Sequence, residues 1–318
     1  MKRGIGRLFW LLLKYGVSLA CLIYVFRGVP LSDLWATLKR YPPLPMGGVL
    51  VVALVGYVAM GTRLAFMATP SLTFRSTFCA TLVGQALNNV LPAKAGEIAK
   101  AAWIARSNGV SFHKTLGIVF MERFFDVNVL ALLSLWFLWS LGERGVVAGF
   151  VACLAAGWAV LLLFSLRPSV AERFCRLFGQ GRLGNFVSQA LSGILSNMTS
   201  RQLIWLCWTS LAVWAIHAFQ MYLNLNAVAG LGLNWDAALA VFAVSGLSML
   251  LPSSPGAIGV YEAFTAAMLK AYGIPAEEAL AVALFAHMMQ FIPVTTAGGI
   301  IFAAFPQKIE EKEKNCPS

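Results

Sequence analysis

Charged residues are scarce in this sequence. Of its 318 residues only 12% are charged and 59% are hydrophobic, with a mean hydropathy of +0.76. A soluble domain has roughly 25% charged and about 45–50% apolar residues. The polar surface is too small to coat a globule in water, so most side chains must face lipid or one another. The composition therefore indicates an all-α polytopic membrane protein.

Motifs for metals, disulfides and nucleotides are missing as well. The six cysteines are scattered, with no Cys-x-x-Cys pair and no histidine at ligand spacing. We therefore expect no metal, no cofactor and no enzymatic activity. The net charge of +11 comes from bases in short loops between apolar runs, which is typical of membrane topology and of contact with anionic headgroups. Nucleic acid is not an expected partner.

Long apolar runs divide the chain into spans. A helix needs roughly 20 mainly apolar residues to cross a bilayer. Six runs qualify, at about residues 8–26, 47–67, 115–141, 146–166, 203–228 and 279–305. With the N-terminus inside, most Lys and Arg residues, Arg63 and Lys100 among them, fall in inside loops, which places both termini in the cytoplasm. We predict one transmembrane domain over 1–306 in a prokaryotic plasma (inner) membrane and a disordered charged tail over 307–318.

The predicted inside loop 168–202 is amphipathic. Apolar residues recur at three- and four-residue spacing between Leu183 and Met198, with polar residues between them. The pattern predicts a helix lying on the cytoplasmic membrane surface. A hairpin docked on the helical bundle would give the same pattern.

Two shorter apolar runs, 74–91 and 237–251, end in the same Leu-Pro-x-x-x-Gly sequence. The motif positions are Leu91, Pro92 and Gly96 in the first copy and Leu251, Pro252 and Gly256 in the second. The matching order of the flanking residues predicts a repeat with halves at about 72–141 and 232–305. Three predicted spans separate the copies, and because three is odd, the second half is inverted. Inverted repeats with broken helices are a transporter architecture, with the substrate site at the repeat interface.

Each break is expected to interrupt a helix inside the membrane. Proline cannot donate to the helix ladder, glycine relaxes the backbone, and freed backbone groups in lipid must be satisfied by protein or water. We therefore predict two re-entrant hairpins whose breaks line a cavity. The N-termini of the helices after the breaks suit an anionic group. A pair of structural kinks without a ligand is the alternative. Polar residues near the breaks are Asn88, Asn89, Lys94, Glu97 and Glu262.

Ionisable residues also occur within the third predicted span. Glu122, Arg123 and Asp126 are spaced so that they share one helix face near the middle of the membrane. Ionisable groups at that depth face the bundle interior and usually mark a pathway. The repeat places His287 and Gln290 at the equivalent depth, and histidine changes charge near neutral pH. An ion cluster, or for His287 a hydrogen bond, that only fixes packing is the alternative. Polar residues on one face of the fifth span are His217, Gln220 and Asn224.

Two stretches carry a resemblance to a known family. They contain Asn88-Asn89-Val90-Leu91-Pro92, Gly96-Glu97, Glu122-Arg123-Phe124-Phe125-Asp126 and Pro255-Gly256-Ala257-Ile258-Gly259-Val260-Tyr261-Glu262. The chain resembles, over nearly its whole length, the transmembrane region of lysylphosphatidylglycerol synthases. In bifunctional members this region is the flippase that moves the aminoacylated lipid to the outer leaflet, and some stand-alone members are associated with hopanoid synthesis.

The sequence departs from that family in two respects. The chain ends at Ser318, shortly after the last predicted span, so we expect a stand-alone member without the soluble aminoacyl-transferase domain. His287 also stands where many relatives carry arginine, which departs from a two-arginine phosphate site.

These observations together predict a lipid flippase-like transporter that moves a phospholipid or a polyprenyl- or hopanoid-type lipid between leaflets. Its expected partners are membrane lipids and lipid-synthesis enzymes. A non-catalytic membrane scaffold for lipid-synthesis enzymes and a membrane-embedded headgroup transferase are the alternatives. The candidate substrate-binding residues are Asn88, Asn89, Pro92, Lys94, Gly96, Glu97, Glu122, Arg123, Asp126, Pro252, Gly256, Glu262, His287 and Gln290.

Overall fold

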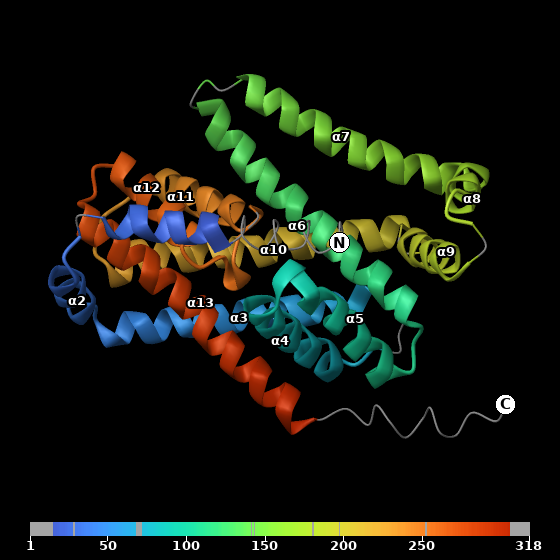
Figure 1. Cartoon of the computed structure of the whole chain (residues 1–318), viewed down its shortest axis with the longest axis horizontal. Coiled ribbons are helices and arrows are strands. Elements are labelled where there is room, and N and C mark those ends of the chain that lie inside the picture. The colour runs from blue at the N-terminus through green and yellow to red at the C-terminus, as the bar shows by residue number, and fades with distance from the viewer. Residues whose placement is uncertain are drawn as a thin grey trace, which may run out of the picture.

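The computed structural model describes residues 15–305, except 28, 68–71, 141, 143, 180, 197 and 252. The described part consists of helices and short loops, with no strand. Figure 1 shows an elongated bundle in which α3 (Pro43–Met67) and α10 (Ser200–Leu223) run along the long axis. The prediction of an all-α membrane protein is confirmed, whereas the tail 307–318 lies outside the described residues.

Several helices are long and apolar enough to cross a membrane. Among the described residues these are α3, α7 (Arg144–Leu166), α10 with its π-helical extension Asn224–Val228, and α13 (Ala276–Ala304). A fifth span results if the helix Tyr15–Phe26 and α2 (Leu31–Lys39), which meet at 81°, are counted as one bent span. α6 (Phe112–Ser140) has 29 residues but is not among these helices; it contains Glu122, Arg123 and Asp126. The number of crossings and the side of the termini stay predictions.

Both predicted repeat halves have the same order of elements. The first consists of α4 (Phe74–Val90), a 3-10 turn η1 (Pro92–Lys94), α5 (Ala95–Asn108) and α6. The second consists of α11 (Trp235–Ser248), a 3-10 turn η3 (Pro255–Ala257), α12 (Val260–Ala271) and α13. A proline begins each 3-10 turn, because it lacks the N–H that a continuing α-helix would need. Each half is thus a broken-helix hairpin followed by a helix of 29 residues.

The two hairpins approach each other from opposite ends of the bundle. The α4–α5 hairpin starts where α3 ends, whereas the α11–α12 hairpin lies toward the end that holds α2 (Figure 1). Their breaks meet, because α4 contacts η3 and a Cβ on Gly256 would lie 3.3 Å from the carbonyl oxygen of Asn89. Asn89 also reaches α13, where its Nδ2 donates a hydrogen bond to Thr295 Oγ1 (2.8 Å).

Two apolar cores support the breaks from either side. One core joins α2, α3, α10, α11, α12 and α13, with Val241 and Leu280 at 0% exposure. The other joins α3, α4, α5, α6 and α10, with Ile104 and Leu206 at 0% exposure. Because α3 and α10 contribute to both cores, these two helices connect the two halves of the bundle.

The segment 168–202 forms a hairpin of α8 (Pro168–Arg176) and α9 (Arg182–Leu195). α9 packs closely on α6, because a Cβ on Gly117 would lie 2.3 Å from the carbonyl carbon of Gly193. The segment thus packs on the bundle through α9, and its position at the cytoplasmic membrane surface stays a prediction. α7 lies at the edge of the bundle in Figure 1, and Leu161 is its buried residue.

Candidate functional site

A cavity of about 800 Å³ lies where the two breaks face each other. Leu130, Val213 and Phe242 form part of its apolar wall, and Trp214, His217 and Ser245 add polar groups. Nine of the predicted site residues line this cavity: Asn88, Asn89, Pro92, Lys94, Glu97, Arg123, Asp126, Gly256 and Gln290. The cavity therefore brings together residues from both breaks and both long helices.

Four predicted site residues lie behind the cavity rather than in its wall. Gly96 is a packing residue, because a Cβ there would lie 2.0 Å from the carbonyl oxygen of Gly84. Glu122, Glu262 and His287 are buried in ion pairs or hydrogen bonds away from the cavity. Pro252 lies outside the described residues.

Arg123 is the partly accessible cation of the cavity. Its side chain is 33% exposed; Nη2 lies 3.0 Å from Glu97 Oε1, and Nη1 lies 3.3 Å from Asp126 Oδ2. Asn88 Nδ2 donates a hydrogen bond of 2.7 Å to the same Glu97 oxygen. Among the described residues, Arg123 Nε, Glu97 Oε2 and Asn88 Oδ1 find no hydrogen-bond partner. Buried polar atoms are normally satisfied, so this corner suits an additional polar ligand.

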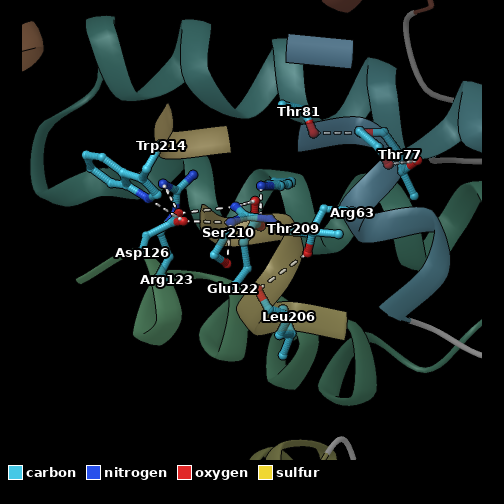
Figure 2. Close-up of polar contacts among 12 residues, drawn as sticks. Arg63, Thr77, Thr81, Glu122, Arg123, Asp126, Leu206, Thr209, Ser210 and Trp214 are labelled. Carbon is cyan, nitrogen blue, oxygen red and sulfur yellow. Dashed lines mark hydrogen bonds and ion pairs between the residues drawn. The ribbon is translucent and has the colours of Figure 1, made fainter. Parts of the chain in front are cut away.

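A buried ion network holds the cavity carboxylate in place. Figure 2 shows Asp126 with Arg63, Arg123 and Trp214 converging on it. Trp214 Nε1 donates a hydrogen bond of 3.0 Å to Asp126 Oδ1. Arg63, from α3, lies 2.7 Å from Asp126 and 2.6 Å from Glu122. Lys100 Nζ lies 2.5 Å from Glu122 Oε2, so Glu122 joins two buried cations.

The placement of Arg63 and Lys100 in an inside loop is wrong. Their exposed fractions are 0% and 1%, and both side chains point into the bundle. Arg63 stands four residues before the end of α3, where an arginine commonly reaches the membrane surface. The acidic pair on α6 is the signal that could have located these partners, because buried carboxylates require cations.

The charges of the cavity and the network do not cancel. The paired groups are three cations and three carboxylates, namely Arg63, Lys100, Arg123, Glu97, Glu122 and Asp126. Lys94 lines the cavity and is exposed, with no ion pair within 4.0 Å among the described residues. It adds a cation to a network that is otherwise neutral.

Both breaks hold a non-glycine residue in the left-handed region of backbone space. The φ angles are 56° at Lys94 and 57° at Ala257, and the described chain has no other such residue. This conformation costs of order 1–3 kcal/mol and persists where the surrounding structure enforces it, often at functional sites. The strain at Lys94 directs a cationic side chain to the cavity wall.

The N-terminus of α12 does not offer the free anion site that its position suggests. Glu262 Oε2 accepts a hydrogen bond of 2.7 Å from the backbone N–H of Gly259. Its other oxygen lies 2.6 Å from His287 Nδ1. The carboxylate of Glu262 therefore occupies the place that a ligand anion would take.

The polar face of α10 divides into two parts. His217 lines the cavity, and its Nδ1 lies 3.5 Å from Gln220 Oε1. Gln220 and Asn224 are buried and lie outside the cavity lining. Among the described residues, no three His, Cys, Asp or Glu side chains gather closely enough to hold a metal ion.

The chain is similar in sequence to several known proteins. A UPF0104 membrane protein of Methanothermobacter thermautotrophicus is 25% identical over 277 residues, covering 80% of this chain and 81% of the relative. Another, from Methanocaldococcus jannaschii, is 24% identical over 242 residues, covering 72% and 98% of the two chains. Glycosyltransferase AglD of Haloferax volcanii is 26% identical over 266 residues, which cover 70% of this chain but only 42% of that protein.

The match to a protein family extends over most of the chain. Residues 11–298 match the family described as the lysylphosphatidylglycerol synthase TM region. This range includes both breaks, the buried ion network and the cavity between the halves. The chain is therefore a multi-pass membrane protein that belongs to the family of lysylphosphatidylglycerol synthase transmembrane regions.

Proposed function

We propose that this protein is a lipid flippase-like transporter, which moves a phospholipid or a polyprenyl- or hopanoid-type lipid between leaflets. The observation that carries the proposal is a cavity that both breaks line together and that Lys94 and Arg123 also line. The two hairpins would be re-entrant in the membrane and inverted relative to each other. Such a site at the interface of inverted repeats suits a substrate held near the midplane.

The headgroup of this lipid would carry a phosphate. A phosphate between Arg123 and Lys94 would compensate the uncancelled charge of Lys94 and form charge-assisted hydrogen bonds with the guanidinium. Glu97 contacts Arg123 at 3.0 Å and would be the group that the phosphate displaces. The acyl or polyprenyl chains would remain in the bilayer, beside the apolar wall formed by residues such as Leu130 and Phe242.

Lipid-synthesis enzymes are the proposed functional partners. The family is named after a synthase, and one relative is named a glycosyltransferase of which this chain matches less than half. The same membrane region thus occurs in proteins with different names. This suits a transport step that can follow different modifications of a lipid. We therefore propose that this chain receives its lipid from a separate modifying enzyme.

Leaflet asymmetry in proteoliposomes tests the transport function. Purified protein is reconstituted with a fluorescent phospholipid, and the fraction reached by an impermeant quencher is followed over time. Arg123→Ala should slow translocation at least about tenfold, because hydrogen bonds to charged groups contribute about 1.5–3 kcal/mol. Arg173→Ala, an exposed arginine of α8, is the matched control.

The outcomes separate transport from the alternatives. Wild-type rates in Arg123→Ala would refute the assigned role of this residue. Absence of translocation by the wild-type protein, over a panel of phospholipids and polyprenyl phosphates, would refute transport and favour a scaffold. Chemical conversion of the labelled lipid would instead indicate a headgroup transferase.

A further inference from the structure

The two repeat halves contain an equivalent contact between a glutamate and a basic residue. Glu97 and Glu262 are each the third residue of the helix that follows the break. Arg123 and His287 are each the twelfth residue of the long helix that comes next. The ion pair Glu97–Arg123 (3.0 Å) and the pair Glu262–His287 (2.6 Å) therefore occupy matching positions.

The matching pairs differ in accessibility. In the first half the side chains are 18% and 33% exposed, at Glu97 and Arg123. In the second half they are 1% and 2% exposed, at Glu262 and His287. The first pair is thus open to the cavity, whereas the second is closed.

Tyr261 links the closed pair to the cavity. It lines the cavity, and its ring lies 4.5 Å from the ring of His287. Phe291 covers the histidine from another direction at 5.8 Å, and its ring also approaches Gly256. A small displacement of the second break would therefore change the access of water to His287.

Few titratable groups surround this pair. Glu262 and Tyr261 are the titratable residues whose contacts with His287 are seen in the described part of the chain. Among the described residues, none of the other titratable groups on α12 and α13, or on the elements packed against these helices, forms an ion pair or hydrogen bond with Glu262 or His287. These groups are Lys270 on α12, Glu277 and Glu278 on α13, and, on the neighbouring elements, Tyr15, Cys21, Tyr24, Asp33, Lys39, Tyr57, Arg63, Arg75, Cys79 and Asp236.

Protonation would change the net charge of the closed pair. A neutral His287 donates its Nδ1 hydrogen to the Glu262 carboxylate, which leaves the pair with one negative charge. A proton taken up from water at Nε2 makes an imidazolium and brings the net charge to zero. An uncompensated buried charge is costly, so the protonated pair favours the closed arrangement and the deprotonated pair favours hydration.

We propose that Glu262 and His287 form a proton-binding site, which couples lipid movement in the second half to a proton gradient. The proposal rests on the proposed transport function and adds a second substrate, the proton. In the first half the permanent charge of Arg123 would hold the headgroup. In the second half the proton would bind His287 from water on one side of the membrane. It would leave to water on the other side when the pair becomes accessible from there.

The test measures lipid and proton in the same vesicles. Proteoliposomes containing a trapped pH-sensitive dye and a fluorescent phospholipid are placed in a pH gradient of either polarity. With one proton moved per lipid, a gradient of about one pH unit should shift the steady-state leaflet ratio by up to about tenfold. Proton movement should accompany lipid movement in the wild-type protein.

Charge-locked variants supply the decisive comparison. His287→Arg should still move lipid, but with no dependence on the gradient and no proton movement. Glu262→Gln keeps the side-chain volume and should also lose the gradient dependence. It replaces the arginine variant in this test if His287→Arg fails to fold. His113→Arg, at the start of α6, is the control and should behave as wild type.

Each result has a defined meaning. A wild-type protein that moves lipid at a rate and ratio independent of the gradient would overturn proton coupling while leaving the transport function intact. Retention of coupled proton movement in both His287→Arg and Glu262→Gln would overturn the assignment to this pair. Absence of lipid movement by the wild type in every gradient would overturn the transport function together with the coupling.

Discussion

Arg63 holds Asp126 at two points: Nη1 lies 2.7 Å from Oδ1, and Nη2 lies 3.2 Å from Oδ2. The same Nη2 lies 2.6 Å from Glu122, so one guanidinium from α3 compensates two carboxylates on α6. Because all these groups are buried, removing the cation would leave uncompensated charge inside the bundle.

Arg63→Met should therefore destabilise the protein strongly. We expect a loss of about 3–5 kcal/mol in the free energy of unfolding, as for other broken buried ion pairs. Thermal unfolding in detergent measures the change, and Arg201→Met, an exposed arginine at the start of α10, is the control. Equal melting temperatures for the two variants would show that the network contributes little. Adding Asp126→Asn to Arg63→Met should cost less than the sum of the separate changes, because the two residues are in contact.

Gly96→Ala should force the first hairpin apart. The added Cβ would lie 2.0 Å from the carbonyl oxygen of Gly84, which is backbone and cannot rotate away. Overpacking of this kind typically costs about 1–3 kcal/mol. Gly149→Ala is the matched control, since α7 has open space there. The melting temperature should fall in the first variant and not in the second; a similar response of both would contradict the close approach of α4 and α5.

Glu97→Gln should increase the affinity for anionic lipids. The change removes one of the two carboxylates that compete with a phosphate for Arg123. The pair is partly exposed, so the gain should be modest, in the range of about 0.2–1 kcal/mol or up to about fivefold. Native mass spectrometry with phosphatidylglycerol measures the bound fraction. Phosphatidylcholine is the reference lipid, and equal gains for both lipids would point to a general opening of the cavity instead.

Cysteine accessibility should establish the orientation. In a variant with all six cysteines replaced, Arg144→Cys at the start of α7 should react with an impermeant maleimide added to intact cells. Arg173→Cys in α8 should react only after permeabilisation. The reverse pattern would place both termini outside, and labelling of both positions from one side would exclude a crossing by α7.

Much of the fold could be predicted from hydropathy and from the repeated break. The long apolar runs became helices with nearly the predicted bounds, because backbone groups in lipid are satisfied within a helix. The order of elements in both halves followed from Pro92 and Gly96 and their counterparts. The packing of 168–202 on α6 could not be predicted from the sequence, because the close contact of Gly117 with Gly193 depends on tertiary packing.

The residues that line the cavity could be predicted from the sequence, whereas the buried ion network behind them could not. Asn88, Lys94 and Arg123 could be identified because polar groups are rare in apolar runs. Arg63 could not, because an arginine near a helix end is compatible with both a surface and a buried position. Glu97 lines the cavity, whereas Glu262 caps its own helix. This difference depends on contacts that a single sequence does not reveal.

The ion network also has a consequence for biosynthesis. α6 carries Glu122, Arg123 and Asp126, so it is a poor candidate for membrane insertion on its own. Arg63 and Lys100 precede it in the chain and leave the ribosome first. We therefore expect α3 and α5 to enter the membrane with these two cations still unpaired. α6 then inserts as their ion-pairing partner. Ser210 and Trp214 are synthesised last of these residues. Their hydrogen bonds to Arg63 and Asp126 are therefore added after the charges of α6 have been paired.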